Sequence, residues 1–392
     1  MIIIKNANIV SMEDINYKIS DILIENNKFS KIGLINELDY PNATIIDAKG
    51  MLLTPGIVDP HCHIGLIEST IGWAGSDGNE ITNPIYPELR GIDSVKPQDP
   101  CFEEALYSGV TTVCCGPGSA NIIGGTFCAL KTKGKTVNEM VLKEEIAMKM
   151  ALGENPKRCY GNSNRNPATR MASAALMREW LFKARDYYEK KQKYLSDLKL
   201  DPKSAKKPEF NMKLESLSRV FDGMLVKIHA HQLDDIFTAM RIIKEFNLNA
   251  TIDHCTEGYL FPDVLKEYNQ KCIIGPVFGN KSKYELKHKS FESAKVLNDN
   301  NIEFAIMTDH PVIPLSNTLT QASLFRKAGL SEYDTLKALT ISAAKLCQID
   351  DRVGSIKEGK DADLVIWSGD PFHYLTDAKV VILNGKIEKN TL

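Results

Sequence analysis

The stretch Thr54-Pro-Gly-Ile-Val-Asp-Pro-His61-Cys-His63 decides the fold, because an apolar run ends in two histidines spaced two residues apart. Side chains at positions i and i+2 of a strand point to the same face, so His61 and His63 share one face. Two imidazoles on one face of a buried strand are suited to bind one borderline cation such as Zn²⁺. The stretch therefore predicts a metal site at the carboxyl end of a buried strand.

Three further apolar runs end in groups that bind metals. The runs Val226-Lys-Ile-His229-Ala-His231 and Ala250-Thr-Ile-Asp-His254 end in histidines, and Ala305-Ile-Met-Thr-Asp309-His310 ends in a carboxylate followed by a histidine. Only eight histidines occur in the chain, so their concentration after strands is informative. Active sites of barrels lie at the carboxyl ends of the strands, so we expect these groups to meet around one centre.

The middle of the chain alternates short apolar runs with helical stretches, which is typical of a parallel sheet covered by helices. Eight runs are found, the number that closes a (β/α)8 TIM barrel. They are Leu53–Val58, Thr111–Cys115, Phe127–Lys131, Ile146–Leu152, Met224–Ile228, Ala250–Asp253, Cys272–Ile274 and Phe304–Met307. We predict a barrel over residues 56–354, interrupted at 161–222 by a helical insertion whose lysine-rich part faces solvent.

Both ends of the chain read as short strands and predict one small β-sandwich domain built from residues 1–55 and 355–392. The expected strands are Ile2–Ile4, Ala7–Val10, Asp21–Glu25, Lys28–Ile32, Thr44–Asp47, Asp363–Trp367 and Lys379–Leu383. Asn26-Asn27 is a hairpin turn signal, and Asn384-Gly385 is a type I′ turn signal.

The composition of the chain limits the classes of partner that it is expected to bind. The chain has 48 basic and 50 acidic residues, so no global charge favours nucleic acid or an anionic membrane, and we expect only a small-molecule substrate. Nine scattered cysteines without a CxxC pair predict reduced thiols in the cytoplasm. A run of about 18 apolar residues is absent, which argues against a membrane span.

The sequence resembles the amidohydrolase superfamily, specifically the imidazolonepropionase-related amidohydrolase group. The resemblance rests on the Thr54–His63 stretch, on Gly109-Val-Thr-Thr-Val113, on the metal-capable residues above, and on Val353-Gly-Ser-Ile-Lys-Glu-Gly-Lys-Asp-Ala-Asp-Leu-Val365. It covers nearly the whole chain. It specifies superfamily and fold strongly and substrate weakly.

The resemblance implies a metal-dependent hydrolase whose divalent metal, expected to be zinc, is bound by His61, His63, His229 and His254. Asp309 would be both a ligand and the general base, because a metal lowers the pKa of bound water toward about 7 and a nearby carboxylate can accept the proton. His229 is preferred over His231 as the ligand. His231 would then contact substrate or stabilise a developing oxyanion.

The number of ions is left open by the sequence. Binuclear relatives bridge two ions with a carboxylated lysine, and Lys149 stands inside the apolar run of the fourth strand, where a charged amine is costly. Glu154 is the alternative bridge, Lys131 is a third, and a mononuclear centre needs none.

Substrate contacts are expected from Gly118 and Ser119 in the loop after the second strand, and from Arg158, whose guanidinium can hold a carboxylate. The predicted reaction is hydrolysis of a C–N bond in a cyclic amide or amide of a small metabolite. A metal-dependent deaminase or a dipeptidase on the same fold is the alternative, and a catalytically silent scaffold is a remote one. Assembly into a homo-oligomer is an expectation of the resemblance only.

Overall fold

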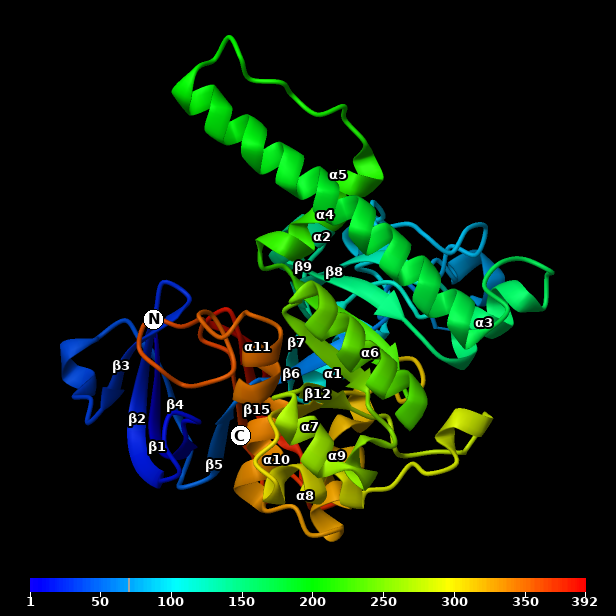
Figure 1. Ribbon diagram of the computed structural model, residues 1–392. Coiled ribbons are helices and arrows are strands. Elements are labelled where there is room, and N and C mark those ends of the chain that lie inside the picture. The colour runs from blue at the N-terminus through cyan, green and yellow to red at the C-terminus, as the bar shows by residue number, and fades with distance from the viewer. Residues whose placement is uncertain (70) are drawn as a thin grey trace.

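Two sheets organise the chain in a computed structural model that describes residues 1–69 and 71–392 (Figure 1). The sheet of the small domain, the small sheet, has eight strands in the order β16-β15-β14-β5-β1-β2-β3, with β4 paired to β1. Its strands come from both ends of the chain: β1 Ile2–Val10, β2 Tyr17–Glu25, β3 Lys28–Gly33, β4 Thr44–Asp47, β5 Leu52–Pro55, β14 Leu364–Trp367, β15 Ala378–Leu383 and β16 Lys386–Asn390. The division of the chain into domains at residues 55 and 355 stays a prediction.

The turn chemistry of the small sheet follows the sequence. Asn26 and Asn27 have φ values of 49° and 64°, and Asn384 and Gly385 have 48° and 68°, as the connecting turns of right-twisted hairpins require. The two short runs expected near the start form one strand, β1, whose register shifts between Ile4 and Ala7.

The second sheet also has eight strands and is a nearly closed barrel with the strand order β13-β12-β11-β10-β9-β8-β7-β6. The TIM-barrel fold with a small β-sandwich domain is therefore confirmed. The barrel strands are β6 Ile57–Cys62, β7 Val110–Cys115, β8 Ile123–Lys131, β9 Val141–Ala151, β10 Leu225–Ala230, β11 Ala250–His254, β12 Lys271–Ile274 and β13 Phe304–Ile306. The seam between the last and first strands is held by two backbone bonds, Asp309 N to His61 O at 3.2 Å and His63 N to His310 O at 2.8 Å.

The run Leu53–Val58, expected as one barrel strand, is divided between the two sheets. β5 pairs with β1 and β14 of the small sheet, and β6 pairs with β7 of the barrel. Gly56 stands between them, where an added Cβ would lie 2.1 Å from the Thr111 hydroxyl. Only glycine allows so close an approach, so the chain changes sheet at this residue.

The third barrel strand runs against its neighbours. β8 pairs antiparallel with both β7 and β9, whereas the other neighbouring pairs in the barrel are parallel. The expectation of a parallel strand at Phe127–Lys131 is therefore wrong in direction. Antiparallel neighbours need only short connections, which explains why no long helix separates the second, third and fourth strands.

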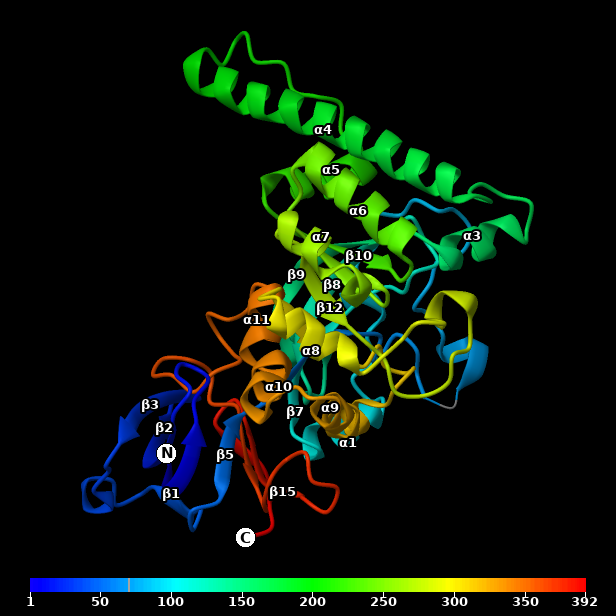
Figure 2. The ribbon, with the colours of Figure 1, turned by 60° about the horizontal axis from the view of Figure 1, so that its bottom comes forward.

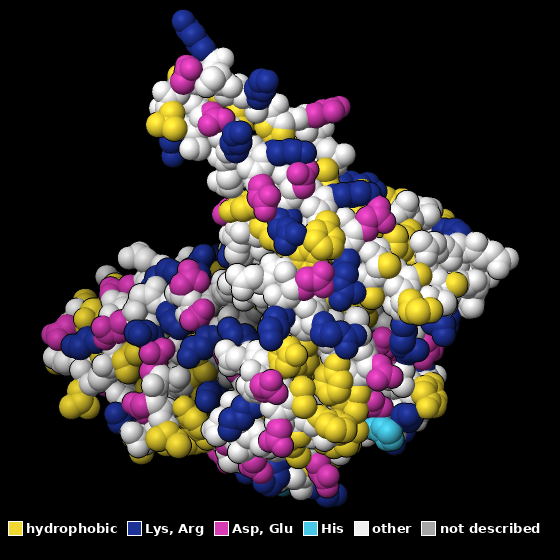
Figure 3. Space-filling model, in the orientation of Figure 1, with side chains coloured by type: hydrophobic (Ala, Val, Ile, Leu, Met, Phe, Trp, Pro, Cys, Tyr) yellow, Lys and Arg dark blue, Asp and Glu magenta, His cyan; other side chains and the backbone are white. Residues whose placement is uncertain are grey.

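Helices cover the outside of the barrel, and one of them projects far from it. They are α1 Cys101–Tyr107, α2 Val137–Met140, α3 Glu154–Gly161, α4 Arg170–Leu200, α5 Met212–Ser218, α6 Leu233–Phe246, α7 Pro262–Glu267, α8 Glu292–Asp299, α9 Thr318–Lys327, α10 Glu332–Leu339 and α11 Ile341–Leu346. The far end of α4 reaches away from the body (Figures 1 and 2), and side chains of both charge signs cover it (Figure 3). Within the described ranges, none of the helices is long and apolar enough to cross a membrane.

Candidate metal centre

The histidines and the carboxylate that follow separate barrel strands are brought to the same end of the barrel. His61 is in β6, His229 in β10 and His254 ends β11, while Asp309 follows β13. The three imidazoles are buried, with exposures of 0%, 2% and 4%. Both His254 and Asp309 have left-handed backbones, at φ 72° and 55°, which is uncommon for residues other than glycine. Such backbones cluster at functional sites.

One group of ligand atoms comes from His61, His63 and Asp309, which lie within 4.8 Å of one another. The Oδ1 atom of Asp309 is 3.2 Å from His63 Nε2 and 3.7 Å from His61 Nε2. On the other side of the rings, His61 Nδ1 is 2.5 Å from Asp253 Oδ2, and His63 Nδ1 is 2.7 Å from the Gly116 carbonyl oxygen. Both rings thus donate through Nδ1 and turn Nε2, which carries the lone pair, toward the shared centre.

A second group comes from His229, His231 and His254, again within 4.8 Å. His254 Nδ1 lies 2.9 Å from the Gly275 carbonyl oxygen, so its Nε2 is also left free. The ring of His254 is 5.6 Å from that of His61, which joins the two groups. His229 and His231 both belong to this group, so the geometry leaves either able to act as the ligand.

Lys149 lies at the first group. Its Nζ is 3.2 Å from His61 Nε2, and its side chain is fully buried. Burial lowers the pKa of Lys149 to about 8, against the attraction of Asp253 and Asp309. With this pKa, a fraction of Lys149 is the uncharged amine at neutral pH, and the uncharged amine is the form that reacts with CO₂.

The other two bridge candidates lie elsewhere. The carboxylate of Glu154 is 3.7 Å from Arg158, and in the described part of the chain it belongs to neither group. Lys131 pairs with Asp363 and, at 3.1 Å, with Asp361, close to the small sheet. The alternatives Glu154 and Lys131 are therefore corrected, because neither side chain joins the histidines.

Four of the histidines at the two groups are held neutral. Burial lowers the pKa of His61, His229, His231 and His254 well below the usual range, and neighbouring cations lower it further. A neutral imidazole has a free lone pair, which is the form that binds a metal. The donor set of neutral imidazoles, one carboxylate and one buried amine fits a zinc-type ion.

A cavity of about 520 Å³ opens beside these groups. It is lined by Gly118, Ser119, Arg158 and His231, the residues expected to contact substrate, together with His63, His229, His254 and Asp309. From the loop after the first barrel strand, Asn79 also lines it. Two other arginines that follow the fourth strand do not line it in the described part of the chain: Arg165 contacts Thr82, and Arg170 contacts Asp235.

Lys283 and Asn155, which line the cavity, and the buried Glu285 were missed from the sequence. Glu285 Oε1 is 3.5 Å from His231 Nε2 and 2.5 Å from Lys283 Nζ, and Glu285 is fully buried. Lys283 also donates to Asn155 Oδ1 at 3.1 Å, and Asn155 donates to Ser119 Oγ at 2.8 Å. The lysine-rich segment 281–289 gave no signal of this role, because a charged run most often faces solvent.

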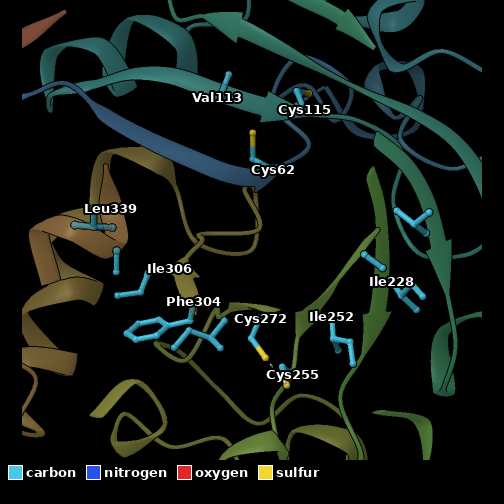
Figure 4. Packing of buried hydrophobic residues seen from close by; sticks show 14 of the residues in the cluster. Cys62, Val113, Cys115, Ile228, Ile252, Cys255, Cys272, Phe304, Ile306 and Leu339 are labelled. Carbon is cyan, nitrogen blue, oxygen red and sulfur yellow. Dashed lines mark hydrogen bonds between the residues drawn. The ribbon is translucent and has the colours of Figure 1, made fainter. Parts of the chain in front are cut away.

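The cysteines beside the histidines point away from them. Cys62 donates to the Cys114 carbonyl oxygen at 3.6 Å, and the Cys255 and Cys272 sulfurs are 3.5 Å apart. Figure 4 shows Cys62 near Cys115 and Cys255 near Cys272 among buried apolar side chains. Both cysteines therefore pack in the core, as strand alternation predicts.

His310, next to Asp309, belongs to a third group. Its ring, the Asp99 carboxylate and the Cys101 sulfur offer ligand atoms within 4.8 Å of one another. This group does not line the cavity, in the part of the chain that the structure describes. His310 is thus separate from the two histidine groups.

Comparison with known proteins assigns the family. Residues 52–389 match the amidohydrolase family. The chain belongs to the amidohydrolase family. The crystal structure of an amidohydrolase from Thermotoga maritima MSB8 is 39% identical, with a TM-score of 0.92 and complete coverage of both chains. This amidohydrolase chain is therefore a hydrolase that acts on carbon–nitrogen bonds, and its group is related to imidazolonepropionase.

Curated relatives agree at lower identity. The amidohydrolase TasK of Hapsidospora irregularis is 28% identical over 375 residues, which cover 90% of this chain and 38% of that protein. The chain thus spans little more than a third of that relative. An imidazolonepropionase of Cupriavidus pinatubonensis is 24% identical over 373 residues, covering 88% of this chain and 82% of that enzyme.

Proposed function

We propose that this amidohydrolase hydrolyses an amide or cyclic amide of a small metabolite at a divalent-metal centre, with zinc as the metal. The observation that carries the proposal is the pairing of three Nδ1 atoms, in His61, His63 and His254, with an oxygen acceptor each. Such partners fix the tautomer of a metal-binding imidazole and point its Nε2 at the ion. The free nitrogens of both groups, together with Asp309, supply enough donors for two ions.

Lys149 is our proposed bridge between those ions, as a carbamate formed from its buried amine. His61 and His63 would bind one ion with Asp309, and His229 and His254 would bind the other. A bound divalent cation supplies polarisation of the substrate carbonyl and a lowered pKa for water. Side chains of the protein supply proton transfer and binding of the carbonyl oxygen.

Asp309 would move the proton. Its carboxylate stands between the two histidines of the first group and lines the cavity, where it can accept a proton from the attacking water. The same carboxylic acid can then give the proton to the leaving nitrogen as the C–N bond breaks. Water is thereby divided between the new carboxylate and the new amine.

His231 would bind the carbonyl oxygen of the substrate. Its Nδ1 is 2.7 Å from Thr256 Oγ1, and a hydroxyl that donates there leaves the proton of the neutral ring on Nε2. Nε2 is buried and makes no hydrogen bond among the described residues, although the Glu285 carboxylate lies 3.5 Å away. A donor held in this way can stabilise the oxyanion that develops during acyl transfer.

The test is an assay of metal-loaded protein against N-acyl amino acids, dipeptides, cyclic amides and aminopurines. Release of an amine with a new carboxylate supports amide hydrolysis. Release of ammonia from an aminopurine supports the deaminase instead, and cleavage restricted to dipeptides supports a dipeptidase. Absence of turnover with metal fully bound would count in favour of the catalytically silent scaffold.

A further inference from the structure

The cavity beside the histidines carries more cationic than anionic side chains. Arg158, Lys283 and Lys289 line it, and Asp309 is the one carboxylate-bearing residue among its lining residues in the described part of the chain. The Asp309 carboxylate already faces His61 and His63. It therefore does not balance the cations on the other walls.

Lys283 is balanced inside the protein. Its Nζ is 2.5 Å from the buried Glu285 carboxylate and donates to Asn155 at 3.1 Å. The nearest histidine to that carboxylate is His231, at 3.5 Å. Lys283 thus holds Glu285 and Asn155 beside the second histidine group. Its positive charge is largely neutralised by Glu285.

The positive charges of Lys289 and Arg158 are not neutralised in this way. The Nζ of Lys289 donates to the carbonyl oxygens of Gly279 and Asn280, at 2.7 and 2.8 Å, and neither partner carries charge. An ammonium has three donors, so one N–H is left for a ligand. Arg158 has an acidic partner, Glu154, only at 3.7 Å and with much of its own side chain exposed.

An apolar surface lies on the same cavity. Phe278, Leu286, Val312 and Ile313 contribute to its lining. Phe278 and Val312 are exposed by 40% and 60%, so these side chains keep apolar area that a ligand can cover. A ligand that matches this cavity has an anionic end and an apolar side chain, besides the group that reacts.

We infer that the substrate is an amide that carries a free carboxylate and an apolar side chain, as an N-acyl amino acid does, and that Lys289 and Arg158 bind the carboxylate. This inference rests on the proposed amide hydrolysis. In the reaction, water adds its hydroxyl to the acyl carbon and a proton to the nitrogen, and the C–N bond breaks. The substrate carboxylate is not changed, so it contributes binding alone.

The experiment compares N-acetyl-leucine with N-(3-methylbutyl)acetamide, which is the same amide without the carboxylate. Metal-loaded wild-type protein should hydrolyse N-acetyl-leucine with a kcat/KM at least about tenfold higher, since hydrogen bonds to charged groups contribute roughly 1.5–3 kcal/mol and 1.4 kcal/mol is tenfold. Lys289→Gln keeps a donor for the two carbonyls but removes the charge. It should raise KM for N-acetyl-leucine about tenfold and change KM for the neutral amide much less.

Two variants serve as controls. Lys289→Arg keeps the charge and should restore most of the affinity. Lys287→Gln changes a lysine of the same loop that contacts Tyr284 and does not line the cavity, and it should alter neither substrate. Equal hydrolysis of both amides, or an equal effect of Lys289→Gln on both, would overturn the inference.

Calorimetric binding separates this inference from the proposed function. If neither amide is hydrolysed, the proposed reaction fails, and titration of metal-loaded protein with N-acetyl-leucine still decides the anion site. Binding that Lys289→Gln and added salt both weaken supports the site. Binding that is absent, or that the neutral amide matches, overturns it.

Discussion

The Asp253 carboxylate lies 2.5 Å from His61 Nδ1 and 2.9 Å from the Nζ of Lys227, so one buried anion joins a metal-site imidazole to a buried cation. Its other oxygen accepts from Thr251 Oγ1 at 2.6 Å. All of these groups are fully buried. The carboxylate thus fixes both the orientation and the tautomer of His61.

Replacement of Asp253 by Asn should weaken metal binding. The neutral asparagine amide lacks the charge that favours the N–H of His61, and it leaves the Lys227 ammonium unpaired. Partners of this kind typically contribute roughly 10–100-fold in metal affinity. Titration with a chelator measures the effect. Asp263→Asn, at an exposed position of α7, is the matched control. Unchanged affinity in Asp253→Asn would show that His61 is not held through this contact.

Replacement of Asp309 by Asn should abolish turnover while the protein stays folded. The amide cannot accept the proton of the attacking water, and loss of a general base costs about a hundredfold to ten-thousandfold in rate. Steady-state kinetics give the rate, and circular dichroism checks the fold. Asp299→Asn, exposed on α8, should retain wild-type activity. Near-normal activity of Asp309→Asn would contradict the assigned role.

Metal uptake should depend on bicarbonate and on pH through Lys149. Its pKa of about 8 means that the amine is mostly protonated below that pH and mostly neutral above it, and only the neutral amine combines with CO₂. At the same concentration of dissolved CO₂, metal-free protein should therefore reload faster at about one pH unit above this value than at about one unit below it. Lys149→Met should bind fewer ions.

The control for that experiment lies on the same strand. Lys143 is exposed near the start of β9, and Lys143→Met should reload like the wild type. Intact-protein mass spectrometry can detect the added CO₂. An equal metal count in Lys149→Met and wild type would reject the carbamate bridge.

The small sheet should loosen from the barrel in acid through Asp361. Burial raises its pKa, but Arg352, Lys131 and Lys28 outweigh that effect and hold it at about 2. A carboxyl whose pKa is depressed in the folded protein stabilises the fold at pH values above the pKa of an ordinary carboxyl. This contribution, about 1–2 kcal/mol of unfolding free energy, is lost as pH falls from about 4 toward 2. Thermal unfolding across that range measures it.

Asp361→Asn should lower the stability at neutral pH and flatten its dependence on acid. Asp39→Asn, at an exposed carboxylate of the small domain, should leave both unchanged. An unaltered acid transition in Asp361→Asn would mean that other carboxylates set it.

Much of the centre could be predicted because its signals are local. The spacing of His61 and His63, and the position of His254 and Asp309 directly after apolar runs, follow from strand geometry alone. The turn at Asn26-Asn27 is equally local. Each of these features is specified by a few neighbouring residues.

The remainder depends on contacts between distant segments. An apolar run such as Phe127–Lys131 has the same pattern in either direction, so the sequence could not show that β8 is antiparallel. Glu285 meets His231 only because the loop after β12 folds over the barrel mouth. The division at Gly56 becomes visible only when Thr111 stands beside it.

The reversed direction of β8 also bears on how the chain folds. Residues 110–151 form three strands that pair in sequence order through short connections, so little loop-closure entropy opposes their assembly. From β10 onward, each parallel strand can pair with its neighbour only after the crossover segment between them, which contains a helix, has been placed. We expect this meander to form early, and it already carries the Gly116 carbonyl that orients His63 and the lysine that stands at the centre.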